Sequence, residues 1–381
     1  MHHFIFPSKD SWISSGSNHK TGESYRDQNF GKDQILELKK EFFNLSFDYP
    51  TRVLLKFNLN ETGNSISKSI ADGDITNPNF YLRMYESEGN QELSLDYKLA
   101  ALPLSQSWDE GVGKFGDNPK TTNGVSWENR NNYPNTTEVS WSNAPIGQMT
   151  SSHGGNFLNL SGSIQSFDDE SPDINMDITD MTRGWLSGST QHGGIDNHGV
   201  ILKFSGSQET NNTTFGKLNF FSKNTHTIYA PKLEVRWDDS SFSTGSLNQL
   251  TMSGVDNILF AKRLRDEYKT SEKVKFRVGA RKRYIQKTFT DSVQTISGSY
   301  VPEGSGSYSI VDVATGETVV PFEDNNSVSY TKLSCDSNGN YFTQWLSSFE
   351  PNRVYKILLK LKMDDGQELI FDDDYEFKVK D

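Results

Sequence analysis

Several features that mark other classes of protein are scarce or absent in this sequence. One cysteine, Cys335, is present among 381 residues, which excludes an intrachain disulfide and a zinc site built from several cysteines. No apolar run reaches the roughly 18 residues that a transmembrane helix needs, and Met1–Ser15 lacks the cationic start and hydrophobic stretch of a signal peptide. We therefore expect that the chain does not insert into a membrane. We also expect that it is synthesised in a reducing compartment.

Positive charge and apolar side chains are also scarce. Lys and Arg number 38 against 50 Asp and Glu, which gives a formal net charge of −12. Because phosphate backbones are bound by basic surfaces, this balance argues against a nucleic-acid-binding protein. Only 33% of the residues are hydrophobic, but 12% are aromatic, and disordered chains are poor in aromatic rings. The length and composition predict two or three domains with thin cores.

Strand patterns dominate the chain. Short runs of β-branched and aromatic residues are bounded by Asn, Asp, Ser, Gly or Pro, which is typical of antiparallel sandwiches. In Arg52–Leu59, residues such as Val53 and Leu55 alternate with mostly polar neighbours, so we predict a strand with one buried face. One short helix is predicted, capped by the side chain of Thr179 and ended by Gly188.

A break in the strand patterns divides the chain. Asp238–Gly245 is acidic, rich in serine and without periodicity, which is typical of a domain boundary. We predict an N-terminal domain over residues 1–238, a linker over 239–250 and a C-terminal domain over 251–381. The last region contains about seven short strand patterns, the number found in an immunoglobulin-like sandwich.

Few residues form patterns that carry catalysis or metal binding. Asp109 and Glu110 follow Trp108, but glycosidases place two carboxylates about 5–10 Å apart across a sugar, whereas adjacent residues on a strand point to opposite faces. We predict a structural role for this pair and no catalytic residues. The loop histidines His153, His192 and His198 lack metal-ligand spacing, so we predict no metal site and no cofactor. The acidic tracts Asp168–Glu170 and Asp372–Asp374 supply the oxygen ligands that calcium prefers. They lack the loop spacing of a known calcium motif, so calcium binding is an alternative to a purely solvated role.

A loop rich in aromatic and amide side chains is the best candidate ligand surface. Its candidate glycan-binding residues are Trp127, Arg130, Tyr133 and Trp141. Flat aromatic rings stack on sugars, and polar side chains meet hydroxyl groups. The alternative is that Trp127 and Trp141, each of which follows a Val-Ser pair, are core residues of strands.

A basic stretch interrupts the acidic chain between Lys262 and Lys287. Its candidate partner-docking residues are Lys262, Arg263, Arg265, Arg281, Lys282 and Arg283. Because complementary charge steers and orients association, such a stretch can dock on an acidic partner surface. The alternative is a solvated sheet face that happens to be basic.

The first 237 residues resemble the DNRLRE-domain family, a jelly-roll β-sandwich related to some carbohydrate-binding modules. Lys9–Ile13 matches the opening strand of the family, and Thr51–Leu59 matches its best-known strand. Ser107–Gly111 is similar to a Trp-Asp-Glu signature, and Asp177–Gly188 to the short helix. The chain departs from the family in a long insertion after Gly111 and in the lack of a secretion signal.

The resemblance implies a function as well as a fold. Secreted bacterial members of the family carry signals, whereas a phage virion protein is made in the host cytoplasm and needs none. Lys332–Phe342 and Tyr355–Leu358 are similar to β-domains appended to structural proteins of tailed phages. We expect an all-β chain, with a jelly-roll-type sandwich followed by an immunoglobulin-like one.

The expected function is that of a non-enzymatic structural component of a tailed-phage virion, located in the tail, neck, baseplate or capsid exterior. Its expected partners are other virion proteins, in multiple copies, and a host-surface glycan is a further candidate. The alternative is a carbohydrate-binding module that recognises a cell-surface glycan through the loop with Trp127 and Tyr133. A hydrolase of surface polysaccharide that depends on Asp109 ranks last.

Overall fold

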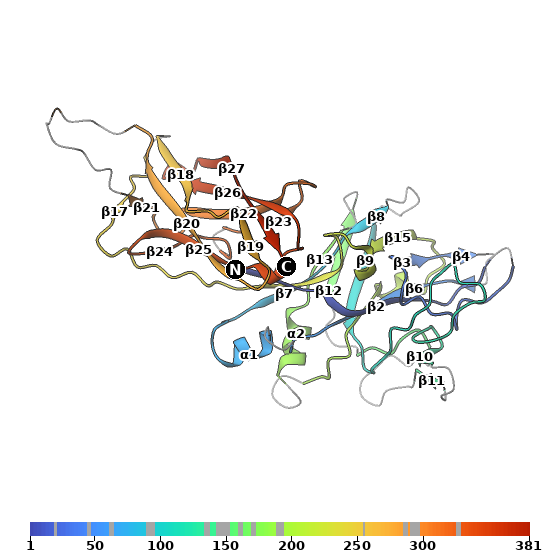
Figure 1. The fold of residues 1–381 in the computed structure, drawn as a ribbon. Coiled ribbons are helices and arrows are strands. Elements are labelled where there is room, and N and C mark those ends of the chain that lie inside the picture. The colour runs from blue at the N-terminus through green and yellow to red at the C-terminus, as the bar shows by residue number, and fades with distance from the viewer. Residues whose placement is uncertain are drawn as a thin grey trace. The chain divides into compact units, whose positions relative to one another are not determined.

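The computed structural model describes residues 1–18, 21–43, 47–60, 65–88, 96–132, 138–141, 153–158, 163–168, 173–187, 194–253, 256–284, 289, 298–324 and 329–381. Its secondary structure is nearly all β, which confirms the predicted all-β sandwich fold (Figure 1). The chain forms two compact units. The N-terminal unit comprises Ile5–Asp74 and Asn79–Val235, and the C-terminal unit comprises Met1–Phe4, Ile75–Pro78 and Arg236–Asp381. Over these residues no helix is long and apolar enough to span a membrane.

The N-terminal unit is built on a five-stranded antiparallel sheet in the order β12-β9-β14-β6-β2. Further sheets have the orders β3-β15-β8 and β16-β7-β13, and β10-β11 and β4-β5 are two-stranded. The strands are β2 (Pro7–Ser14), β3 (Ile35–Lys40), β4 (Phe42–Phe43), β5 (Phe47–Asp48), β6 (Thr51–Phe57), β7 (Asn79–Met84), β8 (Glu86–Glu88), β9 (Asp96–Pro103), β10 (Asn129–Asn131), β11 (Val139–Ser140), β12 (Ser163–Asp168), β13 (Ile174–Asp177), β14 (Val200–Phe204), β15 (Gly216–Phe221) and β16 (Lys232–Arg236). Short helices are α1 (Ile66–Ala71) and α2 (Thr179–Leu186), with 3₁₀ turns at Gly206–Gln208 and Lys223–Thr225.

Strand β6 differs from its prediction because both of its faces are covered. Val53 and Leu55 are fully buried as expected, but Leu54 on the opposite face is also fully buried. Leu54 packs in a separate cluster with Trp127 and Trp141. The sequence between β9 and β12 therefore covers the face of the sheet that local alternation marks as exposed.

Helix α2 lies where the sequence predicts a helix, but its cap is different. The hydroxyl of Thr179 accepts a hydrogen bond from the Phe80 amide at 2.9 Å instead of capping the helix. The Thr179 amide donates to Asp177 Oδ1 at 2.9 Å. The predicted cap is wrong because Thr179 ties the helix to β7, and Gly188 lies outside the described residues.

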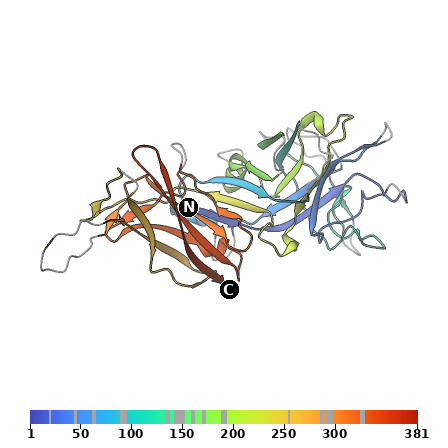
Figure 2. The same cartoon turned by 90° about the horizontal axis from the view of Figure 1, so that it is seen from above.

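The C-terminal unit is a sandwich of two sheets around one core (Figures 1 and 2). One sheet has the order β17-β21-β20-β25-β24 with β18 also paired to β20, and the other has the order β19-β27-β26-β22-β23. The strands are β17 (Asn248–Gln249), β18 (Asn257–Lys262), β19 (Glu267–Lys269), β20 (Lys273–Lys282), β21 (Ser299–Tyr300), β22 (Gly306–Asp312), β23 (Thr318–Val320), β24 (Ser334–Asp336), β25 (Gly339–Trp345), β26 (Val354–Lys362) and β27 (Glu368–Lys380), with a 3₁₀ turn at Leu346–Ser348. Stacked rings of Tyr308 and Phe342, 3.8 Å between centroids, lie at its centre.

The start of the chain belongs to the C-terminal unit, whereas the sequence places it in the N-terminal domain. Strand β1 (His2–Ile5) follows a buried α-amino group, which donates to the carbonyls of Trp237 at 2.5 Å and Tyr330 at 2.6 Å. The Phe4 amide donates to Ser348 Oγ at 3.0 Å, and its ring joins the C-terminal core. The blue start of the ribbon lies among orange and red strands in Figures 1 and 2.

The predicted linker, residues 239–250, is also part of the C-terminal unit. The Cys335 amide donates to the Ser241 carbonyl at 2.9 Å, and Leu250 is only 2% exposed. Strand β17 within this segment pairs with β21 in parallel. The segment lacks periodicity because only short stretches of it form hydrogen bonds with the sandwich. The boundary between the two compact units lies earlier, between Val235 and Arg236.

Candidate functional site

The acidic pair after Trp108 is held in ion pairs. Lys9 Nζ lies 2.9 Å from Asp109 Oδ1. Glu110 accepts from Lys32 Nζ at 2.8 Å and from Lys223 Nζ at 2.5 Å. Burial opposes ionisation of Glu110, but hydrogen bonds from Lys223 and Lys32 outweigh it and lower the pKa of the carboxyl. Both carboxylates thus anchor a loop to neighbouring segments.

The candidate glycan-binding residues that the structure describes do not form one surface. Trp127 and Trp141 are 7% and 2% exposed and belong to the core cluster that covers β6. The Trp141 indole donates to the Ser126 carbonyl at 3.0 Å. A sugar-stacking role for these two rings is therefore wrong, because core packing occupies them.

The two remaining members of that set are accounted for differently. Arg130 is half-buried and donates to the Ser107 carbonyl at 2.9 Å, while Tyr133 lies outside the described residues.

The loop histidine His153 contacts a single carboxylate, since its Nδ1 lies 2.7 Å from Glu128 Oε2. Over the parts of the chain that the structure describes, no group of three or more His, Cys, Asp or Glu side chains could hold a metal ion.

The basic stretch forms an organised surface on the sheet that contains β18, β20 and β25. Along β20, Val274, Phe276, Val278 and Ala280 are buried in the core. Since successive side chains of a strand point to opposite faces, the alternate residues point outward. These outward cations are Lys273, Lys275, Arg277 and Arg281.

Neighbouring strands extend this surface on both sides. Arg277 is opposite Lys262 on β18 and opposite Tyr341 on β25. Lys273 is opposite Trp345 on β25. We define the basic face as the five cations together with the three rings that contact them. Its residues are Lys262, Lys273, Lys275, Arg277, Arg281, Phe260, Tyr341 and Trp345.

Aromatic rings hold the cations of the basic face in place. Lys273 Nζ lies 4.7 Å from the centroid of Trp345, and Lys275 Nζ lies 4.0 Å from that of Tyr341. Arg277 lies 5.3 Å from the same Tyr341 ring. Such contacts contribute about 0.5–1 kcal/mol each at exposed sites. The rings therefore restrict where the positive charges lie, so the face presents ordered charge.

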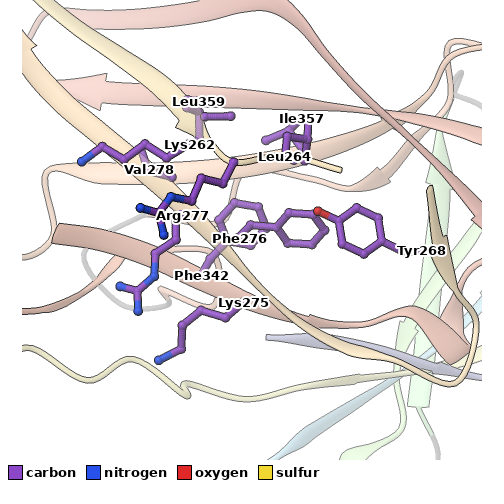
Figure 3. Close-up of a pocket in the computed structure, with 12 residues that line it drawn as sticks. Lys262, Leu264, Tyr268, Lys275, Phe276, Arg277, Val278, Phe342, Ile357 and Leu359 are labelled. Atoms are coloured by element: carbon purple, nitrogen blue, oxygen red, sulfur yellow. The ribbon is translucent and has the colours of Figure 1, made fainter. Parts of the chain in front are cut away.

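Glycine and a small cavity shape the centre of the face. A Cβ at Gly279 would lie 2.4 Å from the Phe260 ring and 2.5 Å from Cε of Lys262, so glycine lets both side chains lie across β20. Figure 3 shows the charged ends of Lys262, Lys275 and Arg277 on one side, with core rings behind them. The cavity there is about 20 Å³, room for about one water molecule.

One carboxylate neutralises part of the basic face. Asp336 Oδ1 lies 2.6 Å from Arg277 Nη1, and its Oδ2 lies 3.6 Å from Lys275 Nζ. The hydrogen bond from Arg277 lowers the pKa of Asp336. Across the described residues, Lys262, Lys273 and Arg281 have no carboxylate within 4.0 Å. The face therefore keeps a net positive charge.

The structure brings together only part of the predicted docking set. Lys262 and Arg281 lie on the basic face, and the exposed Lys282 and Arg283 lie at the end of β20. Arg265 instead forms an ion pair with Glu272 at the turn before β20. The exposed Arg263 follows β18 in a left-handed conformation, with φ at +56°.

Lys273, Lys275 and Arg277 lie in the predicted basic stretch but are not among the candidate docking residues. The signal was present, since Lys273–Arg277 alternates cations with core residues in the pattern of a half-buried strand. Tyr341 and Trp345 could not be found in this way because they lie on a strand more than 60 residues later.

A groove in the N-terminal unit is the second candidate site. Its volume is about 540 Å³, and it is lined by Trp12, Phe115, Glu37, Glu88 and Asn219 among others. Phe115 is 53% exposed, although its amide donates to Asp33 Oδ1 at 3.0 Å. A groove of this size is in the range of small-molecule sites.

Comparisons with known proteins do not assign a family. No protein-family model matches the chain, and no curated protein matches it. Among solved structures, β-glucuronidase from Parabacteroides merdae, with glycerol in its active site, aligns with 99% of this chain at 8% identity and a TM-score of 0.21. The aligned chain spans 35% of the length of that enzyme. Similarity this low carries no argument about fold or function.

Proposed function

We propose that the chain is a non-enzymatic structural component of a tailed-phage virion, which assembles by docking its basic face on an acidic partner. The observation that carries the proposal is the concentration of positive charge in one short segment of the C-terminal unit. Residues 257–283 contain ten Lys and Arg and three Asp and Glu, in a chain that has 38 and 50. Fold stability does not require cations at the outward positions of β20, where any polar residue satisfies the strand pattern.

The composition of the basic face suits protein docking. Ordered positive charges steer an acidic partner and fix its register. Aromatic residues and arginine are enriched in protein interfaces, and Tyr341, Trp345 and Arg277 supply them here. Because the rings already contact Lys273 and Lys275, fewer side chains lose freedom when a partner binds.

Two further observations favour the virion assignment over an enzyme. The motifs from Lys9 to Val235 resemble a sandwich family found in surface and virion proteins. Asp109 and Glu110, the carboxylates that a glycosidase would need, are engaged by Lys9, Lys32 and Lys223.

Particle composition tests the proposal directly. We expect mass spectrometry of density-purified phage particles to detect the chain at a fixed copy number per particle. Lys273→Glu combined with Arg281→Glu should yield a folded protein that is absent from particles. The matched control, Lys68→Glu with Lys98→Glu, changes two exposed lysines of the N-terminal unit and should be incorporated normally. Absence of the unaltered chain from particles would overturn the proposal.

The second candidate function is glycan binding by the groove of the N-terminal unit. The observation that favours it is the half-exposed ring of Phe115 beside the polar groups of Glu37, Glu88 and Asn219. A glycan array should then give hits that Phe115→Ala abolishes, while Trp127→Phe, a core change, leaves them intact. An array without hits would remove this candidate.

A further inference from the structure

The C-terminal unit carries an acidic surface as well as the basic face. Four exposed carboxylates lie near the middle of β27, and we call them the acidic bulge. They are Asp372, Asp373, Asp374 and Glu376. The pairing of β27 with β26 is irregular there, since Tyr375 is opposite Ile357 but Phe371 is opposite Leu359. Three consecutive acidic residues are thereby placed at the surface.

One cation accompanies the acidic bulge. Lys356 Nζ lies 2.8 Å from Asp372 Oδ2, and the hydrogen bond that this lysine donates to Asp372 raises its pKa. Asp374 and Glu376 lie close enough to act on the same lysine electrostatically. Three of the four carboxylates thus act on one ammonium group, which leaves the bulge negative.

The two charged surfaces do not neutralise each other within one molecule. Among the residues that the structure describes, no ion pair joins the basic face to the acidic bulge. Opposite charge must then come from solvent ions or from another molecule. Outside residues 257–283 the chain has 28 Lys and Arg against 47 Asp and Glu, so its own surface is an acidic partner.

We propose that the basic face of one copy docks on the acidic bulge of a second copy. This inference rests on the proposed function and names the partner as the chain itself. The contact joins two different surfaces, so it is heterologous and propagates into a ring or a filament. Ile370, 59% exposed beside the bulge, supplies apolar area to meet the rings of Tyr341 and Trp345.

The contact should depend strongly on salt. The Debye length is about 10 Å at 0.1 M salt and about 3 Å at 1 M. Sedimentation velocity of the full chain should show dimers and larger species at about 0.05 M NaCl and monomers at about 1 M. A chain that remains monomeric at low salt and about 100 μM, where even weak charge-steered contacts are populated, overturns the inference.

Two neutralising variants separate the surfaces. The basic-face variant carries Lys262→Gln, Lys273→Gln and Arg281→Gln, which leaves the pairs of Asp336 intact. The acidic-bulge variant carries Asp373→Asn, Asp374→Asn and Glu376→Gln, which leaves the Lys356–Asp372 pair intact. Each variant alone should be monomeric at low salt. Lys68→Gln with Lys98→Gln is the matched control and should associate as the unaltered chain does.

Mixing the two variants gives the decisive result. Each variant retains the surface that the other lacks, so the mixture should form a 1:1 dimer that does not grow further. Association that survives in either variant alone overturns the inference. A monomeric chain that binds immobilised polyglutamate, and loses that binding only in the basic-face variant, also overturns it but leaves docking on a different acidic virion protein in place.

Discussion

The ion triad of Arg52, Lys203 and Glu209 in the N-terminal unit gives the sharpest prediction about stability. The three residues are 8%, 6% and 5% exposed. Arg52 donates to both carboxylate oxygens of Glu209, from Nε at 2.7 Å and from Nη2 at 3.0 Å, and Lys203 donates to the same carboxylate. Burial opposes ionisation of Glu209, but the charges of Arg52 and Lys203 prevail and lower its pKa.

The triad also connects separate segments of the unit. Arg52 Nη1 donates to the Gly154 carbonyl at 2.5 Å, and the guanidinium lies 4.9 Å from the centroid of the Trp127 ring. Lys203 lies 5.5 Å from the Phe157 ring. The guanidinium of Arg52 thus links β6 to the segment that covers its outer face, and it does so only while Glu209 compensates its charge.

We predict that Glu209→Gln lowers the free energy of unfolding by about 3–5 kcal/mol, because it leaves two buried cations without a counter-charge. In a unit of 150–250 residues, 1 kcal/mol corresponds to about 2–4 °C in Tm. The expected decrease is therefore about 6–20 °C, which calorimetry or thermal circular dichroism measures directly.

Two controls isolate the effect of unpaired charge. Replacing all three residues at once, as Arg52→Met, Lys203→Met and Glu209→Leu, should restore most of the stability, since buried ion groups are often replaced by apolar ones without loss. Lys68→Ala, which removes the exposed Lys68–Asp72 pair, should leave Tm unchanged. A change below about 1 kcal/mol for Glu209→Gln would refute the reasoning.

Three further predictions follow from other buried groups. Burial raises the pKa of Asp10 to about 7, so the folded state binds more protons than the unfolded state between about pH 4 and 7. Stability is therefore lost as pH rises through that window, and Asp10→Asn should gain stability relative to wild type from pH 4 to pH 8 in urea denaturation. Asn29 donates to the carbonyls of Glu110 and Val125 and accepts from the amides of Gly31 and Gly113. Asn29→Asp replaces both N–H donors with acceptors and should lower the free energy of unfolding by about 2 kcal/mol or more. Limited proteolysis should then cut the variant first within residues 111–124, and resistance of that segment would contradict this role of Asn29. Phe4→Ala should lower the free energy of unfolding by about 3–5 kcal/mol and increase hydrogen exchange in β25, because Phe4 packs in the C-terminal core. Exchange that rises only in the N-terminal unit would count against the observed packing.

The strand patterns predict the fold class because they are local. Alternation in Arg52–Leu59 is enough to identify β6, yet it does not reveal that its second face is covered. That face is buried by Trp127 and Trp141, which lie 70 residues or more later in the chain. The chain start is assigned to the wrong domain for the same reason, since Phe4 reaches its core partners only through contacts with the far end of the sequence.

For the candidate sites too, the sequence predicts local properties but not the contacts between distant segments. For Trp127 and Trp141, the local pattern allows a core residue or a ligand platform, and only the tertiary contacts decide for the core. For the basic stretch, composition predicts positive charge, but the selection of Lys273, Lys275 and Arg277 depends on strand alternation and on neighbouring strands. Charge is visible in a sequence, whereas a shared face is a property of the sheet.

The basic face is difficult to explain by folding alone. Lys262 and Arg277 are directly opposite on neighbouring strands, and like charges in that position destabilise a sheet. Lys273, Lys275 and Arg277 add repulsion along one strand, and Asp336 offsets only part of it. Polar uncharged residues at these positions would satisfy the same strand pattern without repulsion. Repulsion among these cations therefore opposes the stability of the unit that carries them, and the docking proposed above would relieve it by supplying negative charge.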